Sequence, residues 1–388
     1  MIRQSILAVL LMSYIVCGVI TGEDSMEEKI EETKRYYASA EEYCSMEDLG
    51  EMDYYLFCNT QLHKDVTGYE GKPTIINHDT QTIEEAKELY QNFKAKLPLE
   101  DEEEENGGNA DGGEERTEVW HISQDCKWVS THKWNEFQTA ETTTVYFEKE
   151  KVKERTAGIM EDPVLAIFLK EGETYKEADE AYCNRLSELR KESRKNDEYD
   201  PVMRENEEGD LLAGVTDNHS RLTVRRIEDG TEQWSFDLKG IRGEARKIRE
   251  ARGYEEDSLW VEIEQFEGNE QEGWLVVQAG SSSFFQIAYP SGEVTYLGEY
   301  LYSPCFSPDG KYLAYSSVDY DNGVGMEPEE EKQTPPPGIY VREVETGKTA
   351  YIYWNPSIET GEDFLEYRFF TWMKKESFEE YMADTQEE

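Results

Sequence analysis

A tight turn followed directly by an alternating strand limits the fold of this chain more than any other stretch. Residues 306–317 read Phe-Ser-Pro-Asp-Gly-Lys-Tyr-Leu-Ala-Tyr-Ser-Ser. Pro308 presets φ for a turn, Asp309 can bond to nearby backbone, and Gly310 can adopt a positive φ. The segment therefore predicts two antiparallel strands joined by Ser307–Gly310.

The same pattern of turn and strand occurs three times along the chain. Two glycines belong to each unit, the first before an apolar strand and the second in a later turn: Gly209 and Gly230, Gly273 and Gly292, Gly310 and Gly347. A four-stranded propeller blade needs such a repeat, because each blade buries both of its faces against its neighbours. We expect blades at residues 205–240, 258–298 and 301–354, the last lengthened by the insertion Asp319–Pro337.

The motif at 306–317 resembles the blade repeat of TolB-like, WD-repeat-like β-propellers, and the resemblance covers residues 205–354. Propellers typically have about 4 to 8 blades, so three units cannot close a ring. Further strands are expected in β-rich stretches outside the three units: Val119–Ser123, Thr142–Phe147, Val164–Leu169 and Glu366–Trp372.

We therefore predict a mainly β chain whose residues 117–388 form a TolB-like propeller, either complete or irregular. The rival architecture is an open, incomplete β-sheet domain with a helix at Glu177–Lys195 packed on it.

The first 22 residues resemble an export signal. Arg3 precedes an apolar run from Ile6 to Ile20, which is short for a membrane-spanning helix. Cleavage after Gly18 or Gly22, an uncleaved anchor and lipidation at Cys17 all stay open, although Val16 makes the lipobox atypical. We expect an extracytoplasmic protein, secreted or attached to the envelope, with membrane contact only through this segment.

Residues 23–99 are predicted to form a small, mostly helical region. Thr82–Glu85 has the pattern of a capping box and leads into apolar residues at helical spacing. Residues 100–116 are acidic and rich in glycine, so they cannot offset their ordering entropy by burial. We interpret them as a linker.

Composition excludes several classes of partner and site. The formal net charge is −46, from 86 acidic and 40 basic residues, so nucleic acid is not expected to bind. The five histidines form no metal-binding motif. Five cysteines follow the signal, and we expect free buried thiols, with a local Cys44–Cys58 bridge as the alternative: Cys44, Cys58, Cys126, Cys183 and Cys305.

Motifs of the common enzyme classes are missing from the sequence. It contains no Gly-x-Ser-x-Gly elbow, Walker A loop or His-Glu-x-x-His. No catalytic or cofactor-binding residue is nominated. The acidic insertion offers Asp319, Asp321 and Asn322 as weak Ca²⁺ ligands, although their spacing fits no loop template.

One segment is basic in this acidic chain. Cations crowd between Arg242 and Arg252. They either pair with acidic loops of the same chain, the interpretation we favour, or form a docking patch.

The sequence thus predicts an exported, non-catalytic propeller that acts as a protein-interaction platform, as the resemblance implies. The first alternative is a carbohydrate-binding or carbohydrate-cleaving propeller, prompted by 47 aromatic residues. The second is a calcium-dependent module. For eight candidate site residues we expect structural roles in turns: Gly209, Gly230, Gly273, Gly292, Pro308, Asp309, Gly310 and Gly347.

Overall fold

The computed structural model describes most of residues 117–383 and part of the chain before them. The described ranges are 43–64, 68–71, 74–76, 92–93, 117–134, 140–148, 150–158, 168–171, 174–194, 203–251, 260–280, 283–299, 301–317, 338–352 and 364–383. The predicted signal, the linker and the acidic insertion with Asp319, Asp321 and Asn322 lie outside these ranges.

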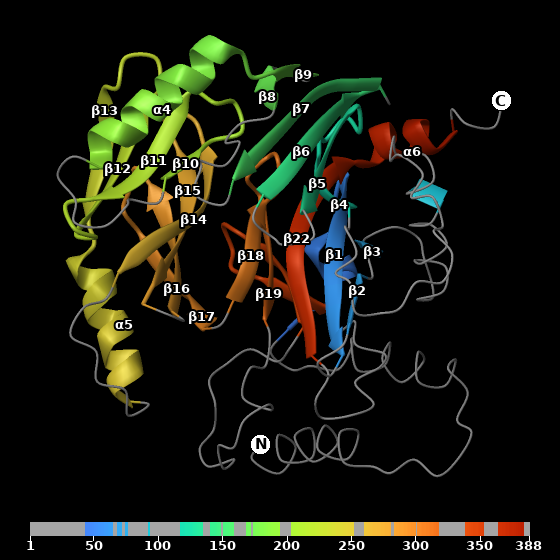
Figure 1. The fold of residues 1–388 in the computed structure, drawn as a ribbon. Helices are drawn as coiled ribbons and strands as arrows, with labels where there is room; N and C mark the ends of the chain where they lie inside the picture. Colours follow the sequence, from blue (N-terminus) through green and yellow to red (C-terminus); the bar gives the residue numbers. More distant parts are fainter. Residues whose placement is uncertain are drawn as a thin grey trace, which may run out of the picture.

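Strands dominate the fold, which confirms the mainly β class (Figure 1). Within the described ranges, five four-stranded antiparallel sheets and one two-stranded sheet are present. Three of the four-stranded sheets are β10 (Met203–Glu205), β11 (Leu211–Thr216), β12 (Arg221–Arg226) and β13 (Glu232–Asp237); β14 (Val261–Gly268), β15 (Gly273–Ala279), β16 (Ser283–Tyr289) and β17 (Val294–Glu299); and β18 (Leu301–Phe306), β19 (Tyr312–Ser317), β20 (Gly338–Glu343) and β21 (Thr349–Ile352). They span the three units expected from the glycine pairs.

Two more four-stranded sheets flank this series. One comes before it in the chain, and the other contains the last strand, β22. One comprises β4 (Thr117–Ile122), β5 (Trp128–Trp134), β6 (Ala140–Phe147) and β7 (Glu150–Gly158). The other joins β1 (Tyr54–Lys64), β2 (Gly68–Gly71) and β3 (Thr74–Ile76) to β22 (Phe364–Lys374). The small sheet is the hairpin of β8 (Phe168–Glu171) and β9 (Thr174–Glu177).

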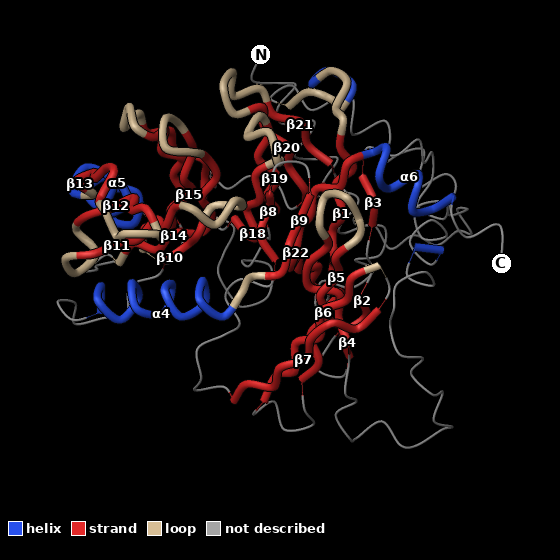
Figure 2. Tube along the Cα trace, turned by 90° about the horizontal axis from the view of Figure 1, so that it is seen from above, coloured by secondary structure: helices blue, strands red, loops and turns tan. Residues whose placement is uncertain are grey.

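The sheets follow one another around a common centre, as blades of a propeller do (Figure 2). One edge strand from each sheet contacts the next, in the order β10, β14, β18, β22 and β4. Between the β4 and β10 sheets, Gln124 donates a side-chain hydrogen bond to Glu207. The architecture is therefore propeller-like, and the rival open sheet does not describe it.

The two ends of the described chain form one sheet, and here the structure differs from the expected helical region. β1 pairs antiparallel with β22, from Tyr54 opposite Lys374 to His63 opposite Phe364. Tyr55, Leu56, Phe57 and Cys58 are all buried, because this sheet packs on both faces. A strand that is buried on both faces shows no alternation of polar and apolar residues, so its pattern is ambiguous. Of the predicted helix near Thr82–Leu97, only Asn92 and Phe93 are described, and both are helical.

Alternation along each strand sends neighbouring side chains to different sheets. In β19, Leu313 and Tyr315 pack towards the β14 sheet, whereas Tyr312 and Ala314 pack towards Trp372 of β22. The β18 sheet therefore separates two hydrophobic clusters, one on each face. Neighbouring propeller blades pack against each other in this way.

Helix α4 (Glu180–Arg194) covers one face of the β10 sheet, where a neighbouring blade packs on the other sheets. Its Leu186 and Leu189 pack against Leu212, while Leu211 of the same strand faces the β14 sheet. The Glu205 carboxylate lies 3.2 Å from the Arg190 guanidinium. The predicted helix at Glu177–Lys195 thus acts as a substitute for a blade face.

The remaining helices lie at the margins of the ring. They are η1 (Glu47–Leu49), α5 (Lys239–Ala251), between β13 and β14, and α6 (Lys375–Ala383), after β22. Among the described residues, no helix has the length and apolar character needed to cross a membrane.

All five cysteines in the described ranges are free thiols, so no Cys44–Cys58 bridge forms. Cys58 and Cys126 are buried, whereas Cys44, Cys183 and Cys305 are partly buried. Burial raises the pKa of the Cys58 thiol well above its usual value, which keeps the group protonated and unreactive.

Candidate interaction surface at the turn end

One end of the ring carries two kinds of repeated turn, and we call it the turn end. The first kind joins the first two strands of a sheet, at residues 123–128, 206–211, 268–273 and 307–312. The second kind joins the last two strands, at residues 226–231, 288–293 and 343–348. The end of β22 also lies here, since the Lys374 amide donates to the Gln124 carbonyl at 2.9 Å.

The Ser307–Tyr312 turn is held by a closed set of hydrogen bonds. Ser307 Oγ donates to Asp309 Oδ1 at 2.6 Å and accepts from the buried Tyr312 amide at 2.9 Å. Asp309 Oδ1 also accepts from the Lys311 amide at 3.1 Å. Gly310 has a φ of 66°, which glycine adopts without a Cβ penalty. Asp309 therefore has the role of a turn former.

The Ser123–Trp128 turn has the same hydrogen bonds, although no turn was predicted there. Ser123 Oγ donates to Asp125 and accepts from the Trp128 amide, the latter at 2.9 Å. Cys126 takes the left-handed position with a φ of 58°. A shared sequence pattern could have revealed this turn, because Ser-x-Asp-x-Lys-aromatic occurs at both sites.

A third version of this turn uses asparagine. Asn206 Oδ1 accepts from the Leu211 amide at 2.9 Å, and Gly209 has a φ of 69°. In the fourth sheet, Gly273 is the first residue of β15 and lies opposite Gly268, whose φ is 150°. The tight contact between these two backbones leaves no space for a Cβ at either position.

The second kind of turn recurs with little change. At Gly230, Gly292 and Gly347, φ lies between 73° and 76°. Each glycine amide donates to the carbonyl four residues earlier, at 2.8 to 2.9 Å. The six glycines of the sequence pattern thus all lie at the turn end.

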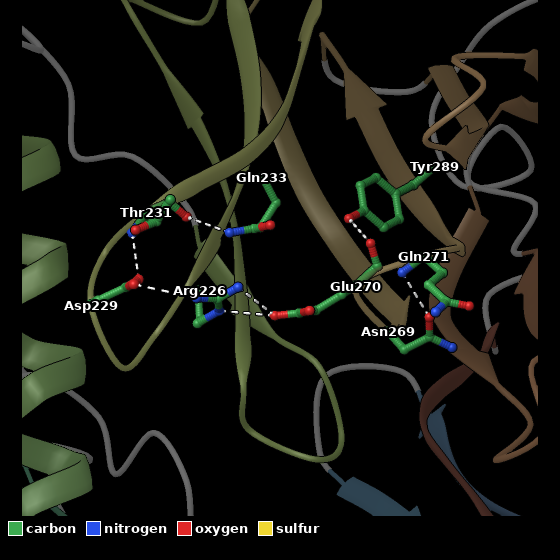
Figure 3. Close-up of polar contacts among 8 residues, drawn as sticks. All are labelled: Arg226, Asp229, Thr231, Gln233, Asn269, Glu270, Gln271 and Tyr289. Carbon is green, nitrogen blue, oxygen red and sulfur yellow. Dashed lines mark hydrogen bonds and ion pairs between the residues drawn. The ribbon is translucent and has the colours of Figure 1, made fainter.

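A polar network joins two neighbouring sheets across the turn end (Figure 3). Arg226 Nε donates to Glu270 Oε1 at 2.8 Å, and its Nη1 lies 3.3 Å from Asp229 Oδ2. Tyr289 donates its hydroxyl to the Glu270 carbonyl at 3.0 Å. The Thr231 amide donates to Asp229, and this bond holds the pKa of the exposed Asp229 carboxyl below its usual value. The arrangement fixes the β14–β15 turn against the β10 sheet.

Carboxylates from different sheets act on two partly buried groups at the turn end, Tyr54 and Cys305. The pKa of Tyr54 is raised to about 12, first by burial and then by Asp309, Asp53 and Glu207. The pKa of the Cys305 thiol is also raised to about 12, by burial and then by Glu207 and Glu267. Negative charge from several turns therefore acts on one central region.

Glu207 connects the two sheets that flank the small hairpin. It accepts hydrogen bonds from Gln124 and from the hydroxyl of Tyr175 in β9. Burial and this carboxylate together raise the pKa of Tyr175 far above its usual value. Sequence reasoning could not have identified this contact, because its three residues belong to three different sheets.

The described residues contain no group of three or more His, Cys, Asp or Glu side chains that could hold a metal ion. Large exposed apolar side chains in the same ranges are Val152, Trp260, Val294 and Tyr296. Trp260 precedes β14 and Tyr296 lies in β17, so these aromatic residues belong to the two opposite edges of one sheet.

No family model and no curated protein matches the chain. Among solved structures, it is similar to Kuenenia stuttgartiensis hydrazine synthase, at 13% identity and a TM-score of 0.33, over 64% of this chain and 68% of the other.

Two further solved structures are similar to the chain at comparable identity and TM-score. One is the β-propeller domain of Myceliophteria thermophila Cps50 (Swd1), at 13% identity and a TM-score of 0.26, over 64% and 82% of the two chains. The other is a putative 6-phosphogluconolactonase from Bacteroides uniformis, at 12% identity and a TM-score of 0.31, over 78% and 83%. At such low scores the propeller-like fold rests on the sheets of this chain itself.

Proposed function

We propose that this chain is an exported, non-catalytic propeller that presents its turn end to a protein partner with a basic surface, at the cell envelope or outside the cell. One observation carries the proposal: carboxylates from several sheets converge on a single end of the ring. Repeated hydrogen-bonded turns hold the backbone that bears them. Export rests on the signal-like residues 1–22, and the TolB-like assignment rests on the 306–317 motif.

The turn end is suited to a protein partner because it is wide and preorganised. Loops fixed by side-chain hydrogen bonds lose little entropy on binding, so more of the contact energy appears as affinity. Exposed carboxylates such as Glu208, Glu272 and Glu345 lie on turns of three different sheets, so the charge is not confined to one loop.

A basic partner is favoured by the field of the whole chain. A net charge of −46 steers cations towards the protein, and the turn end concentrates that attraction on a rigid surface. Association should therefore be fast and should weaken as salt is added.

The proposal is tested by reversing charges at the turn end. A fluorescein-labelled Lys/Arg-rich peptide serves as the probe, together with any partner that wild-type protein captures from envelope extracts. Glu272→Lys and Glu345→Lys should each weaken binding several-fold, mainly through a slower association rate.

Glu250→Lys makes the same charge change at an exposed site on α5, away from the turn end, and is the matched control. If this control weakens binding as much as Glu272→Lys, net charge and not the turn end determines binding, and the proposal fails. Binding that does not respond to salt would also contradict it.

A further inference from the structure

The connection between β13 and β14 contains a helix that the ring itself does not require. α5 occupies Lys239–Ala251 and lies at the opposite end of the molecule from α4 and α6 (Figure 1). The next such connection, from Glu299 of β17 to Leu301 of β18, contains a single residue. Since one residue suffices to join two sheets, the linkage itself does not require α5.

α5 presents a basic surface in an acidic chain. Its Ile241, Ala245 and Ile248 pack into the cluster between the β10 and β14 sheets, and the opposite face is exposed. The helix carries five cations against two acidic residues, Glu244 and Glu250: Lys239, Arg242, Arg246, Lys247 and Arg249. Lys247 pairs with Glu244 at 3.0 Å but its side chain stays 74% exposed, and such exposed pairs are weak. The Lys247 charge is therefore accessible to a partner.

Two glycines leave part of this exposed face without side chains. A Cβ added at Gly240 or Gly243 would meet nothing within 4 Å, so neither glycine is required by packing. Glycine lowers helix stability relative to alanine at such positions. The bare surface allows another polypeptide backbone to approach α5 closely.

Trp260 supplies a rigid apolar anchor at the same end of the ring as the helix. The residue is 48% exposed, and its indole N–H donates to the Gly280 carbonyl at 3.0 Å, which fixes the ring. Gly280 lies in the connection between β15 and β16, the two strands that α5 contacts. Rigid exposed tryptophans are frequent centres of protein interfaces.

A strained turn supports the residue next to this anchor. Asp217, Asn218 and His219 all have positive φ, from 54° to 60°, which is costly for residues other than glycine. His219 Nδ1 lies 2.8 Å from the Val261 carbonyl oxygen and 3.2 Å from the Val261 amide nitrogen. The strained turn thus positions the strand that begins at Trp260.

We propose that α5 and Trp260 form a second docking surface, which binds an Asp/Glu-rich segment of a partner polypeptide. The cations of α5 match acidic side chains, the glycines admit a backbone, and Trp260 provides the anchor. This surface lies away from the turn end, so it does not depend on the function proposed above.

Salt should affect this interaction in an unusual way. At about 0.01 M salt the Debye length is about 30 Å, and an acidic segment is repelled by the net charge of the chain. At about 0.15 M salt it is about 8 Å, so the segment responds mainly to α5. Binding should therefore be strongest at intermediate ionic strength.

The test uses the full chain and a short fluorescein-labelled peptide of alternating glutamate and aspartate, followed by fluorescence anisotropy. Lys247→Glu should weaken binding about tenfold, as expected for loss of a close charge pair. Lys127→Glu is the matched control, because Lys127 is also exposed and pairs with a glutamate, Glu148, but lies at the turn end. Its binding should stay within about twofold of wild type, since a remote charge is screened.

Gly243→Ala separates docking from folding. The extra methyl group should raise the melting temperature, because alanine favours the helix, and should weaken peptide binding, because it blocks close approach. Trp260→Ala should also weaken binding, with the fold checked by circular dichroism.

Several results would overturn the proposal. These are no peptide binding at any salt concentration, equal losses in Lys127→Glu and Lys247→Glu, or wild-type affinity in Gly243→Ala. Tighter binding of dextran sulfate through the same residues would assign the surface to polysaccharide. Self-association that Lys247→Glu abolishes would assign it to a second copy of the chain.

Discussion

The Ser307–Tyr312 and Ser123–Trp128 turns have the same hydrogen bonds but differ in how readily the sequence reveals them. The first contains proline and glycine, which mark turns in any sequence. The second contains glutamine and cysteine at those two positions. What the two turns share is a serine that satisfies a buried amide and an aspartate that bonds to the serine. Side-chain hydrogen bonding, more than the Pro-Asp-Gly signature, defines this structural element.

A related contrast exists between Gly209 and Gly310, and it gives the largest predicted effect. Both have left-handed backbone, but a Cβ at Gly209 would lie 2.6 Å from Leu169 Cδ2 and 2.9 Å from the Tyr182 hydroxyl, whereas a Cβ at Gly310 meets nothing within 4 Å. Gly310→Ala should cost about 1–2 kcal/mol from backbone strain alone. Gly209→Ala should cost about 2–4 kcal/mol, because overpacking adds to the strain.

Urea unfolding of both glycine variants measures this difference. Leu169→Ala in the Gly209→Ala background should remove part of the clash and so reduce the added penalty of the glycine substitution. Equal destabilisation of the two glycine variants would show that crowding by Leu169 and Tyr182 is relieved without cost, and that the two turns are energetically equivalent.

The serines test directly whether the two turns are the same element. Ser307→Ala leaves the buried Tyr312 amide without its acceptor, and Ser123→Ala does the same to the Trp128 amide. Each variant should lose about 1–3 kcal/mol of unfolding free energy, the usual cost of an unsatisfied buried donor.

Ser291→Ala is the matched control for these variants. Ser291 also accepts from a turn amide, that of Glu293, but the bond is exposed and measures 3.3 Å. Its loss should cost less than about 0.5 kcal/mol, because water replaces it. A loss in Ser123→Ala as small as in this control would separate the Ser123 turn from the Ser307 turn.

The glycine pairs explain why part of the fold was predictable. Gly209, Gly230, Gly292, Gly310 and Gly347 all have positive φ at turns between adjacent strands. A glycine in such a turn is a local property, which a sequence displays without reference to distant residues. The three sheets from β10 to β21 could therefore be found from spacing alone.

The remaining sheets depend on contacts that spacing does not show. β1 pairs with β22 across more than 300 residues of sequence, and neither strand has a glycine turn that identifies its partner. The helical prediction for residues 23–99 followed charged, helix-compatible stretches and overlooked Tyr54–Cys58, which is apolar on both faces.

The candidate surface was less predictable than the fold. Asp309 was interpreted from its own turn. The electrostatic effects of Asp53, Glu207 and Glu267 on Tyr54 and Cys305 arise only in the folded ring, so the sequence does not show them. Similarly, the basic residues near Arg242 were identified by composition, whereas the exposed face of α5 follows from the packing of Ile241 and Ala245.

The smallest predicted effect concerns the pH dependence of the Ser307 turn. Burial acts to raise the pKa of Asp309, but hydrogen bonds from Ser307 and Lys311 outweigh it, so the pKa is lowered overall. A lowered pKa in the folded state means that the ionised carboxylate stabilises the fold above the unfolded-state pKa of about 3.9, and this stabilisation is lost as pH falls through the lower folded value. Asp309→Asn keeps the acceptor oxygen but cannot ionise, so its stability relative to wild type should improve as the pH falls below about 4. The effect should be modest, because the side chain is partly exposed and solvent screens its charge.

Urea unfolding of wild type and Asp309→Asn at a series of acidic pH values measures this effect, with Glu345→Gln as an exposed control on the second kind of turn. A constant difference between Asp309→Asn and wild type across the series would show that the hydrogen bonds of this turn do not depend on ionisation of Asp309.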